Sequence, residues 1–142
     1  MTRRNTFLLL ILSFAAIALL SPSGLWTGKP IPVDAFNRRV AKAHQKGDKL
    51  WTESALQVAC EFVGDHERVG SRTIIIDNKA ERFSSAMVTI MEEGYQDDSV
   101  AGSIYRLRMK KADGYWQIQS AQRQWKCQEG RGHTWWSCGT CS

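Results

Sequence analysis

The chain has 142 residues, a length at which one domain of modest size is expected and two domains are not. Its formal net charge of +5 includes Arg3 and Arg4, so the chain without its first residues carries about +3 (5 minus 2), which is too little to indicate a nucleic-acid partner. The charge is unevenly placed, because seven basic and two acidic residues lie between Val100 and Ser142. The final third is therefore expected to have a basic surface.

The first residues have the three-part layout of a secretory signal peptide. Arg3 and Arg4 precede an uncharged apolar run over residues 7–20, and Pro22 and small residues follow it. The run is shorter than the ~20 apolar residues that a membrane-spanning helix needs. We therefore expect residues 1–23 to be a signal peptide, with an uncleaved inner-membrane anchor over residues 7–20 as the alternative. Both interpretations place the rest of the chain in the periplasm or outside the cell.

A linker is expected over residues 24–33, because this segment contains Pro30, Pro32 and two glycines. The remaining residues, 34–142, are expected to form a single small domain. Its first predicted helix has Asp34 as N-cap and ends near Gly47.

A second predicted helix runs from Thr52 to Val63. Thr52 can cap it, and apolar residues recur at three- and four-residue steps until Gly64. The members of this stripe are Leu56, Ala59, Cys60 and Val63.

Beyond Gly70 the apolar residues alternate, which predicts strands over residues 71–77 and 84–92. The segment 99–127 predicts two more strands, joined by a turn at Asp113 and Gly114. Ala121 and Trp125 are out of phase with Trp116, which indicates a bulge or a change of the exposed face near Ser120. The sequence thus predicts an α+β fold, with N-terminal helices packed on one face of a curved antiparallel sheet of about four strands.

Two resemblances support this fold. The helix and hairpin motif residues resemble the small cone-shaped domains of the nuclear transport factor 2-like superfamily; they are Ala55, Leu56, Ala59, Phe62, Val63, Gly114, Trp116 and Ile118. The segment Asp97–Cys141, with D-S-V-x-G, Y-R-L, G-x-W and W-x-C-x-x-G-R-G-H, is similar to a group of uncharacterised exported bacterial proteins. Their tails usually have one cysteine after G-R-G-H, in the place of Cys141, and this chain adds Cys138. The resemblance implies export and brings no activity with it.

The tail could be a metal knuckle, a redox motif or a covalent staple. Four potential zinc ligands lie within it: Cys127, His133, Cys138 and Cys141. In an exported protein disulfides compete with metal binding, and no helix follows the C-x-x-C motif to lower a thiol pKa. We therefore expect no metal or other cofactor and two disulfides, Cys127–Cys141 and Cys60–Cys138, although four cysteines allow three pairings.

No complete catalytic constellation can be named from the sequence, so no catalytic residue is predicted and an enzyme is not favoured. His133 with Ser120 or Tyr105 is the best nucleophile–base set, and an acidic cluster (Glu92, Glu93, Asp97 and Asp98) is typical of a solvated loop. The alternative is a small hydrolase or isomerase that uses the pocket of the cone, with His133 or an acidic residue inside it.

Binding is the more natural use of the basic hairpin and tail. The candidate binding residues combine cations with an aromatic ring and a glycine-flanked Arg-Gly-His segment; they are Arg106, Arg108, Arg123, Trp125, Arg131 and His133. A solvated sheet face would show the same alternation of polar residues. The sequence predicts a binding or structural module of the cell envelope whose partner is an anionic envelope component or a protein. Contact with the membrane is expected only through an uncleaved N-terminal segment.

Overall fold

The structure, a computed structural model, describes residues 27–64, 69–78 and 84–142. The predicted signal peptide therefore lies outside the described residues. Eight elements follow one another: β1 (Lys29–Ile31), α1 (Asp34–Gln45), α2 (Lys49–Thr52), α3 (Ala55–Val63), β2 (Ser71–Asp77), β3 (Ser85–Glu93), β4 (Val100–Ala112) and β5 (Tyr115–Cys127). The predicted α+β class is confirmed.

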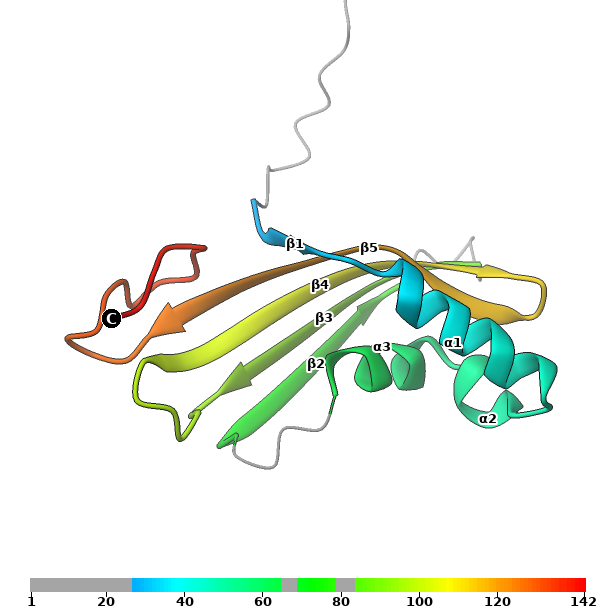
Figure 1. Cartoon of the computed structure of the whole chain (residues 1–142), viewed down its shortest axis with the longest axis horizontal. Helices are drawn as coiled ribbons and strands as arrows, with labels where there is room; N and C mark the ends of the chain where they lie inside the picture. Colours follow the sequence, from blue (N-terminus) through cyan, green and yellow to red (C-terminus); the bar gives the residue numbers. More distant parts are fainter. Residues whose placement is uncertain (1–26, 65–68, 79–83) are drawn as a thin grey trace, which may run out of the picture.

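The strands form one antiparallel sheet in the order β1–β5–β4–β3–β2. The sheet has five strands instead of about four, because part of the predicted linker, Lys29–Ile31, pairs with the edge of β5. Proline lacks an N–H and is tolerated at a sheet edge, so Pro30 does not prevent this pairing. The helices lie on one face of the sheet, here called the inner face, and leave uncovered the end where β5 finishes and β4 begins (Figure 1).

The helices differ from the prediction at their starts. Asp34 is the first residue of α1 and Val33 is its N-cap, so the predicted cap was one residue late. The second predicted helix is two helices, because the Ser54 hydroxyl accepts a hydrogen bond from the Gln57 amide at 3.3 Å and starts α3 afresh. Thr52 ends α2 instead of capping, and its hydroxyl donates to the Asp48 carbonyl at 2.7 Å.

The core lies between the helices and the inner face. Its fully or almost fully buried apolar residues are Val40 of α1, Val58 and Ala59 of α3, Val88 and Ile90 of β3, Leu107 and Met109 of β4, and Ile118 of β5. Leu56, expected on the buried stripe, is 39 % exposed, and Val58 takes its place.

The predicted bulge in β5 is confirmed. Arg108 pairs with Ser120 and Met109 with Ile118, so Gln119 is an extra residue of β5 that has no paired residue on β4. An extra residue reverses the alternation of side chains. Trp116 and Ile118 face inward before the bulge, and Ala121 faces inward after it. The continuing alternation brings Arg123 and Trp125 to the inner face as well.

Candidate functional site

A pocket of about 460 Å³ is lined by Val100, at the start of β4, and by Trp125, near the end of β5, and it therefore lies at the uncovered end of the inner face. It is here called the Arg123 pocket, and its lining comes from β1, the following turn, α3, β4 and β5: Lys29, Pro30, Ile31, Pro32, Phe62, Val100, Tyr105, Arg123 and Trp125. Most of these side chains are apolar or aromatic, and two are cations. This combination is typical of sites for ligands that carry both a charged group and an apolar body.

Arg123 is held in place by buried and aromatic neighbours. Its Nε and Nη2 atoms donate to the Ser103 Oγ at 3.1 and 2.7 Å, and Ser103 is fully buried on β4. The guanidinium carbon lies 5.4 Å from the ring centroid of Tyr105 and 5.7 Å from that of Trp125. Cation–π attraction to two rings and two hydrogen bonds to one hydroxyl together fix the guanidinium in one orientation.

Lys29 brings a second cation to the same place. Its Cα pairs directly with that of Arg123 across the β1–β5 ladder, and its Nζ lies 6.0 Å from the centroid of the Trp125 ring. Like charges directly opposite each other on neighbouring strands repel. In the described part of the chain neither cation forms an ion pair with a carboxylate, whereas Arg39, Arg72 and Lys126 do. The pocket therefore carries two positive charges without a described counter-ion.

The charge of Glu92, a buried carboxylate on β3, is already compensated by neighbouring side chains. Its side chain is 0 % exposed and accepts hydrogen bonds from Arg72 Nε at 2.8 Å and from the Tyr95 hydroxyl. Arg72 also donates to the Gly64 carbonyl at 2.7 Å. Burial, and after it the hydrogen bond to Glu92, raise the pKa of the Tyr95 phenol well above its usual range.

Two of the other predicted acidic residues, Glu93 and Asp97, likewise have partners within the protein. Glu93 pairs with Lys126, and the Asp97 carboxylate accepts the amide N–H groups of Ser99 and Val100 at 2.8 Å each. These backbone hydrogen bonds lower the pKa of Asp97. The acidic cluster thus shapes the β3–β4 connection and contributes no residue to the pocket lining.

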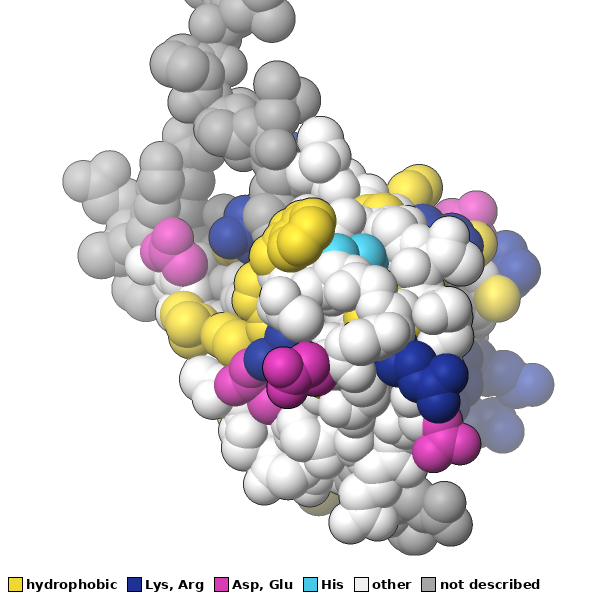
Figure 2. All heavy atoms as spheres, turned by 90° about the vertical axis from the view of Figure 1, so that its left-hand side faces the viewer, with side chains coloured by type: hydrophobic (Ala, Val, Ile, Leu, Met, Phe, Trp, Pro, Cys, Tyr) yellow, Lys and Arg dark blue, Asp and Glu magenta, His cyan; other side chains and the backbone are white. Residues whose placement is uncertain are grey.

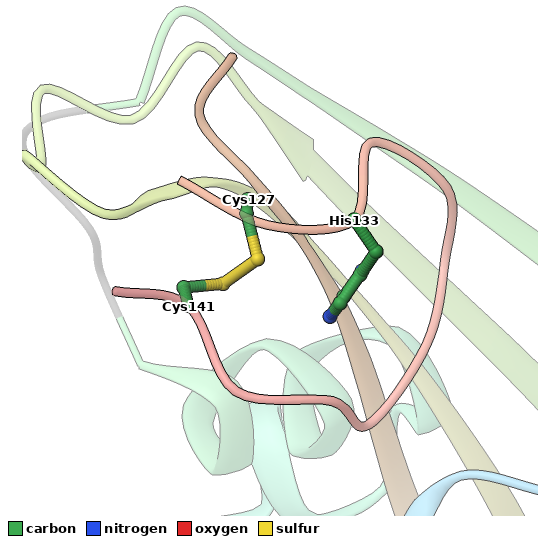
Figure 3. A group of neighbouring side chains, drawn as sticks. All are labelled: Cys127, His133 and Cys141. Carbon is green, nitrogen blue, oxygen red and sulfur yellow. A yellow bond between two sulfur atoms is a disulfide. The ribbon is translucent and has the colours of Figure 1, made fainter. Parts of the chain in front are cut away.

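The predicted Cys127–Cys141 disulfide is confirmed, and His133 lies beside it (Figure 3). One nitrogen of His133 and the two sulfurs lie within 4.8 Å of one another, which is a spacing seen in metal sites. Zinc needs thiolates, and sulfurs bonded to each other offer none. The His133 nitrogens lie 2.8 Å from the Trp135 carbonyl and 3.1 Å from the Gly139 carbonyl, so the ring ties the loop together instead.

The predicted Cys60–Cys138 disulfide is not formed. Cys138 is an exposed free thiol that donates to the carbonyls of Thr27 at 3.5 Å and Arg123 at 3.6 Å, along the β1–β5 edge. Cys60 packs against the core from α3. The pairing fails because the tail folds back beside the end of β5 and does not cross the helices (Figure 1).

Main-chain hydrogen bonds fix the tail in addition to the disulfide. Trp125 and Ser137 exchange two N–H···O bonds of 2.9 and 3.0 Å, and the Cys127 amide donates to the His133 carbonyl at 2.8 Å. The Trp125 indole N–H donates to the Gly139 carbonyl at 2.8 Å. A Cβ atom at Gly139 would lie 2.9 Å from the His133 ring, so a side chain at this position would have to displace that ring. The tail thereby positions Trp125, one wall of the pocket.

The predicted binding residues fall in three places. Arg123 and Trp125 meet in the pocket, whereas Arg106 and Arg108 pair with Thr89 and Met87 on the opposite face, where they line two other hollows of about 490 Å³ each. Arg131 and His133 belong to the tail. At this end of the molecule, apolar and histidine side chains lie next to each other at the surface (Figure 2).

Sequence reasoning missed Lys29 and the roles of Tyr105 and Ser103. Lys29 lies in the segment that its prolines marked as a linker. The alternation in Lys29-Pro30-Ile31-Pro32 could have indicated an extended edge strand. Tyr105 is buried with the core and also lines the pocket, so the inner face continues into the pocket.

Comparison with protein-family models gives no match, and searches of curated proteins and of solved structures give none either. No helix within residues 27–64, 69–78 and 84–142 has the length and apolar character needed to cross a membrane.

Proposed function

We propose that the protein is an exported binding module of the cell envelope whose Arg123 pocket recognises an anionic component. The observation that carries this proposal is the pair of cross-strand cations, Lys29 and Arg123, on one Trp125 ring with no described carboxylate partner. Such an arrangement opposes folding slightly, so an anion from outside would stabilise it. The N-terminal layout and the Cys127–Cys141 disulfide are compatible with an oxidising compartment.

The proposed relationship to cone-shaped domains of the nuclear transport factor 2-like superfamily and to exported bacterial proteins remains part of this proposal. The α+β arrangement, with three helices on one face of an antiparallel sheet, is compatible with it. A cone with one uncovered end naturally leaves a pocket there.

A binding role is favoured over a hydrolase or isomerase by the chemistry of the pocket lining. General acid–base catalysis needs a titratable group aimed at the substrate. Among the described residues that line the Arg123 pocket there is no histidine, aspartate or glutamate, and the two that could transfer protons, Lys29 and Tyr105, lie against the Trp125 ring and the Arg123 guanidinium. His133, the sequence candidate, bonds tail carbonyls, and Glu92 is held by Arg72 and Tyr95.

The proposal is tested by native mass spectrometry of the protein after incubation with an extract of the producing cell's envelope. We expect the wild type to retain an anionic small component that Lys29→Gln/Arg123→Gln loses. The matched control is Arg108→Gln/Lys110→Gln, which removes the same charge from exposed positions on the opposite face and should retain the component. Equal retention by both double variants would contradict a role for the pocket. Cell fractionation tests export separately, and recovery from the cytoplasm alone would contradict it.

A further inference from the structure

We propose that the ligand of the Arg123 pocket is an amphipathic carboxylate, with its carboxylate on Arg123 and Lys29 and its apolar body against the remaining lining. This inference rests on the proposed anion-binding function and adds the chemical class of the ligand. The assignment rests on the guanidinium N–H groups of Arg123 that have no partner in the described chain, on the apolar side chains that line the rest of the pocket, and on the second positive charge at Lys29.

The polar end of the pocket offers one edge of a guanidinium. The Nε and Nη2 atoms of Arg123 donate to Ser103, and Nη1 donates to no residue in the described part of the chain. A guanidinium has five N–H donors, so an edge made of Nη1 and the second hydrogen of Nη2 remains for a ligand. A planar carboxylate fits such an edge with two parallel hydrogen bonds.

This edge is oriented before any ligand arrives. Ser103 is fully buried and holds the guanidinium, and the rings of Tyr105 and Trp125 lie 5.4 and 5.7 Å from it. Little side-chain freedom is therefore lost on binding, which favours affinity. Lys29 adds a second positive charge beside the same Trp125 ring.

A carboxylate matches these donors better than a phosphate monoester does. A phosphate dianion has three terminal oxygens, and the one open guanidinium edge meets only two of them. In the described lining only Arg123 and Lys29 carry positive charge. A carboxylate can be fully satisfied by one guanidinium edge and one ammonium group.

The rest of the pocket is suited to an uncharged body. Its apolar lining residues are Pro30, Ile31, Pro32, Phe62 and Val100. The volume of about 460 Å³ is within the ~300–1,000 Å³ typical of small-molecule sites. Each methylene that such walls remove from water is expected to tighten binding about fourfold, until the pocket is filled.

The test is isothermal titration calorimetry of the full-length protein with four probes: octanoate, acetate, octanol and octyl phosphate. We expect one octanoate per protein. Acetate should bind at least a hundredfold more weakly because it lacks the apolar body. Octanol should bind about ten- to a hundredfold more weakly because it cannot accept two charge-assisted hydrogen bonds.

Variants locate the site and separate its two parts. Arg123→Gln should weaken octanoate binding at least tenfold, and Arg108→Gln, the same change on the opposite face, should leave it unchanged. Phe62→Ala should weaken octanoate but leave acetate unaffected, because only the body contacts Phe62. Circular dichroism of each variant establishes that it is folded.

The outcomes distinguish the two proposals. If octyl phosphate binds more tightly than octanoate, or acetate binds as well as octanoate, the carboxylate-amphiphile assignment is overturned while the anion-binding function stands. If octanol equals octanoate and Arg123→Gln changes nothing, the pocket is an apolar site and both proposals are overturned. If no probe binds, the ligand class assigned here is wrong, and the envelope-extract experiment decides separately on the binding function.

Discussion

The two ends of the inner face are formed by the same strands but carry different kinds of side chain. At the end covered by the helices, β3, β4 and β5 bury apolar side chains, among them Val88, Leu107 and Ile118. At the uncovered end the same strands carry Glu92, Ser103 and Arg123. Burial of apolar side chains stabilises the fold, whereas charged groups at the second end require partners. The covered end therefore supplies most of the stability of the fold, and the uncovered end is where a bound ligand can increase it.

At the uncovered end, the charged residues Glu92 and Arg123 have different kinds of partner. Glu92 has Arg72 and Tyr95 around it and is fully buried, so its charge belongs to the structure. Arg123 has a hydroxyl and two rings but no described carboxylate, and it opens to a pocket. Substitutions at the two positions should therefore have opposite consequences for stability and for binding.

The largest effect is expected for Glu92→Ala. Removal of one partner from a buried ion pair typically lowers the free energy of unfolding by roughly 3 to 5 kcal/mol, because the other charge loses its compensation. Arg72 is only 20 % exposed and has little access to water. Urea denaturation measures the loss. Glu93→Ala is the matched control and should cost less than about 1 kcal/mol, since the Glu93 side chain is 44 % exposed. Equal losses for both variants would contradict a structural role for Glu92.

Leu107→Ala tests the covered end. Leu107 is 0 % exposed in the core between helices and sheet, and truncation of a buried leucine costs about 2 to 5 kcal/mol through lost burial and the cavity that remains. Octanoate affinity should stay the same in the folded variant, because Leu107 does not line the Arg123 pocket. A loss of affinity larger than the loss expected from partial unfolding would show that the two ends are coupled.

The double variant Cys127→Ser/Cys141→Ser tests the attachment of the tail. The bridged cysteines are 14 residues apart, and opening a loop of this size is expected to lower the free energy of unfolding by ~3 kcal/mol. Cys138→Ser, which removes the exposed thiol, should change stability by less than about 0.5 kcal/mol. If the double variant is as stable as the wild type, the hydrogen bonds between β5 and the tail are sufficient to hold it.

Much of the sheet could be predicted because its signals are local. The out-of-phase positions of Trp116 and Trp125 predicted the bulge, and Asp113 and Gly114, both at positive φ, form the predicted turn. What was missed is the consequence of that bulge for Arg123. An inserted residue transfers every later side chain of the strand to the other face. Arg123 therefore lies on the inner face, whereas Arg106 and Arg108 lie on the opposite face.

The remaining errors concern relations that are not local. Pro30 and Pro32 suggested a linker, but an edge strand accepts proline, and its partner in β5 is about ninety residues away in the chain. The Cys60–Cys138 pairing was inferred by elimination, which takes no account of the path of the tail. The uncovered pocket could not be derived either, because it depends on where three short helices end above the sheet.

A smaller effect is expected from Tyr95 at alkaline pH. Its phenol has an ordinary pKa of 10.0, and the folded protein raises this pKa. Below about pH 10 both the folded and the unfolded chain keep the proton, so its contribution is complete. As the pH rises further, the unfolded chain releases the proton and the folded protein retains it, so the free energy of unfolding falls. Urea denaturation at a series of pH values should show a steeper fall for the wild type than for Tyr95→Phe, and equal slopes would contradict the burial of this hydroxyl.

The smallest effect on stability, and the sharpest contrast with Glu92, is expected for Arg123→Gln. The substitution removes two hydrogen bonds to Ser103 but also removes the repulsion between Arg123 and Lys29, and glutamine can still donate to the Ser103 hydroxyl. These terms oppose each other, so the free energy of unfolding without ligand should change by less than about 1 kcal/mol. Octanoate at saturating concentration should raise the unfolding temperature of the wild type more than that of Arg123→Gln, because the variant binds octanoate at least tenfold more weakly. A loss of several kcal/mol without ligand would mean that Arg123, like Glu92, serves the fold and that its charge is not held for a partner.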